Sequence, residues 1–235
     1  MPKTMDIITL ARWKELLSLA KAGSSDAQWE VGYYHEFGAH DNSGKILVRV
    51  DRSAAHHWYE LAAKQDNHTA QCALSNLLSS GERASRNYKT AIYWAKKAIN
   101  HGNASAAFNL GTIYRDLKKP TMAFRWYSQA VSMGDNDALL QLGLCSLFGF
   151  GTKRDIAKAY DYLNEIITRE PSSFCQRTIE NVQYWLAILH LLGIGKSKGS
   201  VANARTLLES ANGDDDHEQA NEILNILGKS EYLSA

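Results

Sequence analysis

The chain has 235 residues and carries 26 Lys and Arg against 25 Asp and Glu, which gives a net charge of +1 at neutral pH. This balance, and the lack of a recognised binding motif, argue against a nucleic-acid partner. Hydrophobic residues make up 45% of the chain and only 3 residues are proline, a composition that favours an all-helical fold over β architectures.

The first stretch of the chain is amphipathic. Leu10, Trp13, Leu16, Leu17 and Ala20 would share one side of a helix from Asp6 to Ala22, so we expect residues 1–25 to form an N-terminal capping helix. Charged residues interrupt the stretch, which therefore resembles neither a signal peptide nor a membrane anchor, and we expect a cytoplasmic protein without membrane insertion. Ser24, Ser25 or Asp26 can cap the next helix.

Two helical patterns then alternate along the chain. The first, called A here, has a small or branched residue at offsets 0, +4 and +5, as in Ala27, Val31 and Gly32, and begins again at Ala70, Ala106, Ala138 and Val182. The second, called B, has offsets 0, +3, +7 and +11, is clearest in Ala91, Trp94, Ala98 and Gly102, and recurs from Ala55, Ala123, Ala159 and Ala204. The residue at +5 would let the B helix pack against the A backbone, while the Ala and Trp side chains of B fill the space between neighbours.

The alternation predicts one elongated domain of five repeats. We place them at residues 26–67, 68–103, 104–135, 136–180 and 181–213. A last helix, Asp214 to Leu227, would end at Gly228 within a C-terminal capping segment at residues 214–235, with the acidic run Asp214–Asp216 at its start.

The connections between A and B differ in length. The third is the shortest and places Pro120 in the first turn of its B helix. The first is long, and its sequence KILVRV could form a short extended segment. Loops of this length are often functional, but a tolerated insertion is the favoured explanation, because long surface loops cost little free energy.

The fourth unit, ALLQLGLCSLFGFGTKRDIAKAYDYL, carries a family resemblance through Gly149, Gly151, Asp155, Lys158 and Ala159. It resembles the Sel-one-like repeat, a relative of the tetratricopeptide repeat. The third unit lacks the loop glycines and is closer to tetratricopeptide spacing. The resemblance implies an α/α right-handed superhelical solenoid of antiparallel helix pairs, with the A helices lining a concave face.

The resemblance also implies function. Similar proteins are mostly non-catalytic adaptors that bind another protein in the superhelical groove, through A-helix positions −1, +2, +6, +9 and +10. The groove residues so predicted are Trp29, Tyr33, Glu36, Phe37, Asn76, Phe108, Thr112, Arg115, Asp116, Leu144, Phe148 and Tyr184. Leu140, Leu147, Ile188 and Leu191 extend the apolar part, which would suit an amphipathic partner segment. The alternative is that these residues pack against the next A helix.

Charge indicates what kind of partner the array would bind. Residues 83–134 hold nine Lys or Arg against Asp116 alone, a local charge of +8 that could attract an acidic protein. Lys96 and Lys97 lie on a B helix, however, where solvated lysines are ordinary.

The sequence offers little support for a catalytic or metal-binding role. Ser18 and Lys21 match an SxxK spacing but lack companion motifs, and no histidine spacing predicts a zinc site. The cysteines Cys72, Cys145 and Cys175 are far apart and indicate reduced thiols. We therefore expect no enzyme, metal or cofactor. Stand-alone relatives serve as regulatory adaptors or as immunity proteins that occlude a toxin, and both roles stay open beside a less favoured hydrolase.

Overall fold

The structure is a computed structural model that describes residues 6–80, 86–169, 174, 176–193, 201–212 and 217–232. The chain divides into two compact units, Met1–Ile113 and Tyr114–Ala235, which are treated separately below.

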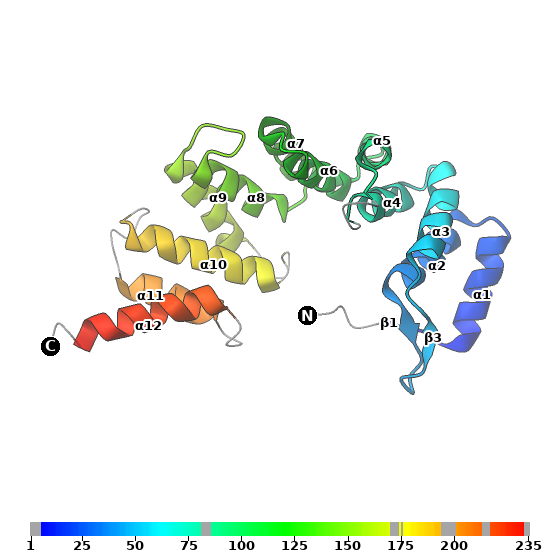
Figure 1. Cartoon of the computed structure of the whole chain (residues 1–235), viewed down its shortest axis with the longest axis horizontal. Helices are drawn as coiled ribbons and strands as arrows, with labels where there is room; N and C mark the ends of the chain where they lie inside the picture. The colour runs from blue at the N-terminus through cyan, green and yellow to red at the C-terminus, as the bar shows by residue number, and fades with distance from the viewer. Residues whose placement is uncertain are drawn as a thin grey trace. The chain divides into compact units, whose positions relative to one another are not determined.

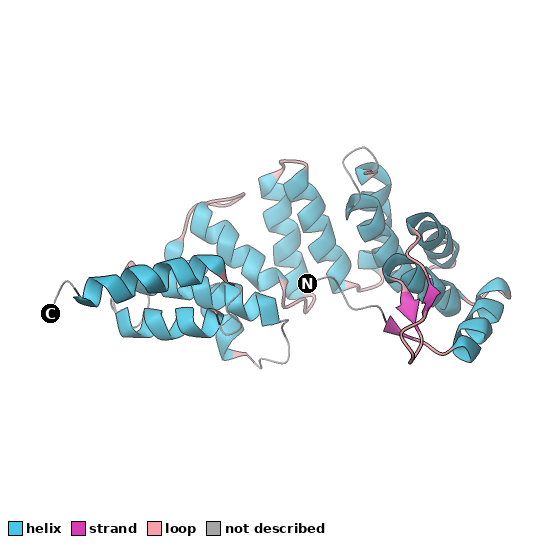
Figure 2. Cartoon of the chain, turned by 60° about the horizontal axis from the view of Figure 1, so that its bottom comes forward, coloured by secondary structure: helices cyan, strands magenta, loops and turns pink. Residues whose placement is uncertain are grey.

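Helices are the main elements of both units (Figures 1 and 2). Unit 1 holds α1 (Leu10–Lys21), α2 (Ser25–Phe37), α3 (Arg52–Lys64), α4 (His68–Ser80), α5 (Tyr88–Asn100) and the larger part of α6 (Ala104–Asp116). Unit 2 holds α7 (Pro120–Ser132), α8 (Ala138–Phe148), α9 (Ile156–Thr168), α10 (Gln176–Leu191), α11 (Val201–Ala211) and α12 (Glu218–Tyr232). Consecutive A and B helices pack as antiparallel pairs, α2 with α3, α4 with α5, α8 with α9 and α10 with α11, which confirms the predicted α/α solenoid of helix pairs.

A small sheet in unit 1 departs from the expected all-helical beginning (Figure 2). Strand β2 (Ala39–His40) pairs in parallel with β1 (Asp6–Ile7) and antiparallel with β3 (Ile46–Val48). The extended segment predicted within KILVRV is confirmed as β3. The predicted helix from Asp6 was wrong, because the backbone of Asp6–Ile7 bonds to β2.

The first helix therefore begins later than its amphipathic pattern suggested. The side chain of Thr9 accepts a hydrogen bond from the Arg12 amide and caps α1 at Leu10. Trp13, Leu16 and Ala20 are buried as expected, but Leu10 is 51% exposed. A capping side chain outside an apolar pattern thus fixed the helix start.

The B helices bury the alanines predicted for their seam, but in α3, α7 and α9 the deep large residue is shifted by one position. The alanines at offsets 0 and +7, such as Ala55 and Ala62, are fully buried. The deepest large residue is at +4, as with Tyr59, Tyr127 and Leu163, whereas the +3 side chains of these helices are only half-buried. In α5 the +3 residue Trp94 is buried as predicted, at 8% exposure.

The residue at +4 of B packs on the glycine at +5 of A. A Cβ built on Gly32 would lie 2.6 Å from Cδ1 of Tyr59, and one built on Gly143 would lie 2.9 Å from Cδ2 of Leu163. This agrees with the close approach of B to the A backbone that the +5 residue predicts.

Several helix ends follow the sequence signals. Ser24 caps α2 by accepting from the Ala27 amide, and Pro120 occupies the first turn of α7, both as predicted. Among the described residues, Asp66 and Lys118 are the non-glycine residues with a left-handed backbone, each with φ of 58°. The helix α12 continues through Gly228, so the predicted stop there was wrong, while Asp214–Asp216 lie outside the described residues.

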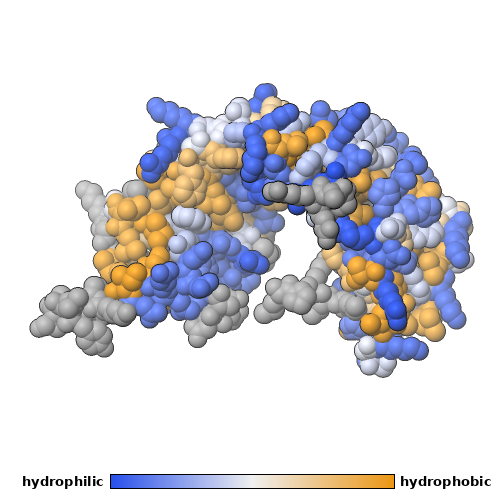
Figure 3. All heavy atoms as spheres, in the orientation of Figure 1, coloured by the Kyte–Doolittle hydropathy of each residue, from blue (hydrophilic) through white to orange (hydrophobic). Residues whose placement is uncertain are grey.

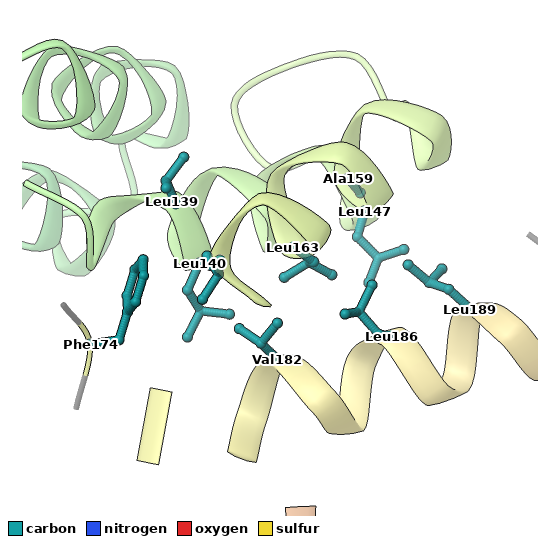
Figure 4. Packing of buried hydrophobic residues seen from close by; sticks show 10 residues of the cluster. Leu139, Leu140, Leu147, Ala159, Leu163, Phe174, Val182, Leu186 and Leu189 are labelled. Carbon is teal, nitrogen blue, oxygen red and sulfur yellow. The ribbon is translucent and has the colours of Figure 1, made fainter. Parts of the chain in front are cut away.

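The core of unit 2 joins α8, α9 and α10. Leu140 and Leu147 from α8, Leu163 from α9, and Val182 and Leu186 from α10 point toward one another (Figure 4). Leu140 and Leu147 thus pack against the next A helix, α10, which was the alternative to a place in the groove. Within the described residues, no helix has the length and apolar character needed to cross a bilayer.

Candidate functional site

The first candidate site is an apolar cavity of about 430 Å³ in unit 2, called the α8 groove here. Its lining residues are Arg115, Asp116, Lys118, Tyr127, Gln141, Leu144, Cys145, Phe148, Phe150 and Trp185. The C-terminal turn of α6, α8 and α10 all contribute, and these are A helices of three successive repeats. The groove therefore lies where the A helices were expected to form a binding face.

Exposed aromatic side chains form the wall of the α8 groove. Phe148 is 61% exposed and meets Trp185 edge to face, with ring centroids 5.3 Å apart and an interplanar angle of 80°. Phe150 is also exposed. Hydrophobic residues gather over the α8 to α10 part of the visible face (Figure 3). Water-exposed rings of this kind are enriched at protein-binding sites.

Two glycines position Phe150 at the groove. Gly149 ends α8 in a left-handed conformation with φ of 70°, and the Phe150 amide then donates to the Cys145 carbonyl at 2.9 Å. At Gly151, with φ of 75°, a Cβ would lie only 2.1 Å from the Pro120 carbonyl oxygen. The loop can approach the start of α7 this closely because Gly151 has no side chain.

The rim of the α8 groove is charged. Arg115 lies 3.5 Å from Asp116 at one edge, and Lys118 is exposed beside them. Cys145 lies deep in the groove, where burial raises the pKa of its thiol to about 11 and the positive charge of Arg115 acts in the opposite direction. The rim carries two positive charges against one negative charge.

The second candidate site, called the α2 pocket here, is a cavity of about 300 Å³ in unit 1. Its lining residues are Trp29, Tyr33, Glu36, Phe37, Tyr59, Thr69, Cys72, Ala73, Asn76, Asn103, Ser105 and Asn109. One wall is aromatic and comes from α2, and the other carries amide and hydroxyl groups from α4, α6 and the turn before α6.

Hydrogen bonds organise both walls of the α2 pocket. The Tyr59 hydroxyl donates to Glu36 Oε2 at 2.8 Å, and burial together with the negative charge of Glu36 raises the pKa of Tyr59. The Asn109 side-chain amide donates to Cys72 Sγ at 3.5 Å. The carboxylate of Glu36 is therefore held in one position at the edge of the aromatic wall.

The two cavities bring together nine of the twelve predicted groove residues. Trp29, Tyr33, Glu36, Phe37 and Asn76 line the α2 pocket. Arg115, Asp116, Leu144 and Phe148 line the α8 groove. The residues selected by the spacing of the A helices thus fall largely in two cavities, and their role in binding a partner stays a prediction.

Three predicted residues lie elsewhere. Phe108 and Thr112 are half-buried on α6 and line neither cavity. Tyr184 stacks on His217, with ring centroids 5.0 Å apart and an interplanar angle of 27°, so its ring packs against the residue that precedes α12.

Residues missed by the sequence reasoning include Trp185, Phe150 and Gly151. Trp185 follows the predicted Tyr184 directly, and Phe150 lies between the two loop glycines. The loop glycines could have indicated an exposed ring between them, because left-handed residues reverse the chain at that point.

The described residues hold no group of three or more histidine, cysteine or acidic side chains placed to bind a metal ion. His35 and His190 are on different units, and burial lowers the pKa of His35. Cys72 and Cys145 form no disulfide among the described residues, and Cys175 lies outside them.

Comparison with known proteins places this architecture in a family. The Sel1 repeat model matches the chain five times, at residues 25–67, 68–103, 104–135, 136–166 and 181–212. The chain belongs to the Sel1 repeat family. As a Sel1 repeat protein it has a helical repeat architecture that generally serves as a scaffold for protein interactions.

Solved Sel1 repeat structures have the same fold. The crystal structure of c5321, a protective antigen present in uropathogenic Escherichia coli strains, is similar with a TM-score of 0.74 and 26% identity, over 92% of this chain and 44% of that one. A Sel1 repeat protein from Oxalobacter formigenes has a TM-score of 0.64 and 24% identity, over 86% of this chain and 75% of that one.

Similar sequences are also found among curated proteins. Chitin synthase regulatory factor 4 of Schizosaccharomyces pombe is 29% identical over 133 residues, which cover 55% of this chain and 20% of that protein. The chain thus spans about a fifth of this relative and less than half of c5321.

Proposed function

We propose that this Sel1 repeat protein is a non-catalytic adaptor that binds a partner protein in the α8 groove. The observation that carries the proposal is the exposed ring of Phe148, which lies against Trp185 in a cavity lined by three successive A helices. Covering these rings would remove apolar surface from water, the main favourable term in protein association.

The charges at the rim define the partner segment. Arg115 and Lys118 outnumber Asp116 beside an apolar wall, so the fitting ligand is an amphipathic segment with a large apolar side chain and acidic neighbours. The charge would favour encounter and orientation, while the apolar side chain would supply most of the affinity.

The decisive experiment compares partner capture by the wild-type chain and two variants. Phe148→Ser removes the exposed ring of the groove, whereas Leu192→Ser changes another exposed apolar residue of unit 2, at 66% exposure, outside the groove lining. We expect the partner captured from the native host to be lost with Phe148→Ser and kept with Leu192→Ser. The captured protein would then be purified, and its dissociation constant for each variant measured by calorimetry.

Loss of a core ring contact commonly weakens such a complex by at least about tenfold. A partner that binds Phe148→Ser and Leu192→Ser equally well would contradict the α8 groove as the docking site. Circular dichroism of both variants would check that their folds are intact.

The identity of the partner would decide between the two finer roles. An immunity role requires that the captured protein be toxic on its own and that co-expression of this chain relieve the toxicity. A regulatory adaptor in the cytoplasm would instead capture an enzyme or an envelope protein whose activity changes on binding. In both roles the chain acts by binding and performs no chemistry of its own.

A further inference from the structure

A third cavity, called the α9 cavity here, lies where the loop after α8 meets the start of α9 in unit 2. It has a volume of about 450 Å³ and shares no lining residue with the α8 groove. Three of its lining residues are cations, Lys153, Arg154 and Lys158, and one is an acid, Asp155. Three positive charges against one negative charge make this a cavity that attracts an anion.

The three cations are not neutralised by a carboxylate. None of them takes part in an ion pair with another described residue, and all three are exposed. Lys158 Nζ lies 5.7 Å from the centroid of the Tyr162 ring, a contact that leaves its charge in place. The Asp155 carboxylate is engaged with the backbone, because its Oδ1 accepts from the Lys158 amide at 3.0 Å and caps α9. A bound anion would therefore relieve the repulsion between the cations.

A hydrogen bond holds the Arg154 side chain at the cavity. Its Nε donates to the Leu147 carbonyl at 3.2 Å, near the end of α8. A Cβ built on Gly149 would lie 3.3 Å from Cβ of Arg154, so the glycine allows the two segments to pass at this distance. Nη1 and Nη2 make no further hydrogen bond to a described residue. These two nitrogens form a planar fork that matches two oxygens of a phosphate group.

A buried hydroxyl without a partner adds a donor to the cavity. Ser146 on α8 lines the cavity and is 1% exposed, and its Oγ makes no hydrogen bond to a described residue. Its carbonyl accepts from the Asp155 amide at 2.9 Å, which places the start of α9 directly beside it. Buried hydroxyls in native proteins normally have a partner. A ligand with acceptor oxygens would supply one.

The other repeats have a larger side chain where the fourth repeat has Ser146. The residue eight positions after the first residue of the A pattern is His35, Leu78, Tyr114 or His190 in these repeats. In the fourth repeat a serine leaves space next to the start of α9 that a larger side chain would occupy.

The first turn of α9 contributes a further positive potential. The helix has 13 residues and begins at Ile156, which also lines the cavity. A helix N-terminus carries a partial positive charge and is a common place for phosphate groups to bind. The Thr152 hydroxyl lines the cavity as a second neutral donor beside Ser146. Cations, hydroxyls and the helix dipole thus favour the same kind of ligand.

We propose that the α9 cavity binds a phosphate group. A phosphate on a side chain carries a charge of about −1.5 to −2 at neutral pH and three strong acceptor oxygens. It therefore matches both the charge and the donors of the cavity, whereas a carboxylate would bring less charge and fewer oxygens. A volume of about 450 Å³ also leaves room for the part of a ligand to which the phosphate is attached. This inference goes beyond the proposed function, because it concerns a different cavity.

The test measures three probes by calorimetry at low ionic strength, namely capped Gly-phosphoserine-Gly, capped Gly-aspartate-Gly and inorganic phosphate. We expect the phosphoserine peptide to bind at least about tenfold more tightly than the aspartate peptide. Tighter binding of the phosphoserine peptide than of inorganic phosphate would identify the ligand as a phosphorylated side chain, and the reverse order would identify it as the free ion. Equal affinities for the two peptides, or no saturable binding of either phosphate probe, would overturn the proposal.

Ser146→Ala tests the buried donor. The variant removes a hydroxyl that has no partner in the described residues, so it should unfold at the same urea concentration as the wild type or at a higher one. The affinity for the phosphoserine peptide should nevertheless fall about fivefold, because the ligand loses one hydrogen bond. Undiminished affinity would contradict the site as proposed.

A pair of variants isolates the charge. Lys158→Gln removes one cation of the cavity, whereas Arg125→Gln removes an exposed cation of α7 that lies outside the cavity lining. We expect about a tenfold loss of phosphoserine-peptide affinity for Lys158→Gln and no change for Arg125→Gln. Equal affinities of the two variants would reject the site, since any binding would then depend on net charge alone.

Two variants separate this inference from the proposed function. Phe148→Ser removes the exposed ring of the α8 groove and leaves every lining residue of the α9 cavity in place. It should bind the phosphoserine peptide as the wild type does, whatever happens to the partner of the α8 groove. Lys158→Gln should conversely keep that partner. A loss of peptide binding in Phe148→Ser would place the peptide in the α8 groove, against the proposal.

Discussion

The ring of Tyr59 packs directly on the backbone of Gly32. A Cβ added to Gly32 would lie 2.6 Å from Cδ1 and 2.7 Å from Cε1 of Tyr59, and the ring itself is buried on all sides at 1% exposure. Because both atoms belong to a rigid ring, this contact fixes how closely α3 approaches α2.

We predict that Gly32→Ala destabilises unit 1 by about 1 to 3 kcal/mol, since overpacking outweighs the better helix propensity of alanine. Gly143→Ala is the matched control, because there the new Cβ would meet the flexible end of Leu163 at 2.9 Å. Urea unfolding followed by circular dichroism measures both variants. A loss at Gly143 as large as that at Gly32 would mean that ring rigidity is not the cause.

The one-residue shift of the B-helix seam gives a second prediction. Leu163→Ala removes a fully buried side chain and should cost about 2 to 5 kcal/mol. Tyr162→Ala removes a larger side chain that is only half-buried, and should cost less. The comparison uses the same unfolding measurement. If Tyr162→Ala proved the more damaging change, the deep position of the seam would be +3 and not +4.

Gly151 connects stability to the α8 groove. Gly151→Ala places a Cβ 2.1 Å from the Pro120 carbonyl oxygen and also forces alanine into a positive φ. We expect a loss of more than about 1 kcal/mol in unfolding free energy and weaker binding at the groove, because Phe150 would move. Gly193→Ala shares the positive φ, at 73°, but has nothing within 4 Å of the new Cβ. Equal losses in both variants would attribute the whole effect to backbone conformation.

The Tyr59 hydroxyl makes unit 1 sensitive to high pH. Burial and the charge of Glu36 raise the pKa of Tyr59 in the folded state, whereas an unfolded tyrosine titrates near 10. The stabilisation is therefore complete below about pH 10 and is lost as the pH rises further, by up to about 1.4 kcal/mol per pH unit.

Tyr59→Phe should reduce this alkaline loss, because the variant has no proton to release there. At neutral pH it should cost about 0.5 to 1.5 kcal/mol for the lost hydrogen bond to Glu36. Unfolding measured at pH 7 and above pH 10 separates the two effects. Parallel pH profiles for variant and wild type would show that Tyr59 does not contribute to the alkaline loss.

Much of the fold was predictable because the same pattern of small and apolar residues recurs in each repeat. Alanines such as Ala55 and Ala62 lie on buried faces as predicted, because small side chains that recur at helical spacing allow two helices to pack closely. The +3 and +4 residues of B are harder to separate, because both lie near the same helix face and the crossing of A and B decides which one is deep. The start of α1 depended on pairing of Asp6–Ile7 with β2, a contact between segments far apart in the sequence.

The sequence predicted which residues would line a groove, but it did not predict how these residues divide between two cavities. Spacing on the A helices selected Tyr33 and Phe148, and both line cavities, while their role in binding a partner stays a prediction. The shape of the α8 groove depends on tertiary contacts such as that of Gly151 with Pro120, which no spacing rule predicts.

The sheet of β1, β2 and β3 has a practical meaning for protein engineering. Ile8, Ala39 and Val48 from this region are buried together with Trp13 on α1 and Val31 on α2, the first helix of the first repeat. One side of that repeat is thus already covered, by strands and α1, and the described residues of the other repeats contain no such strands. A designer who wishes to lengthen the array should duplicate an interior repeat, because a copy grafted onto the first would have to displace the sheet.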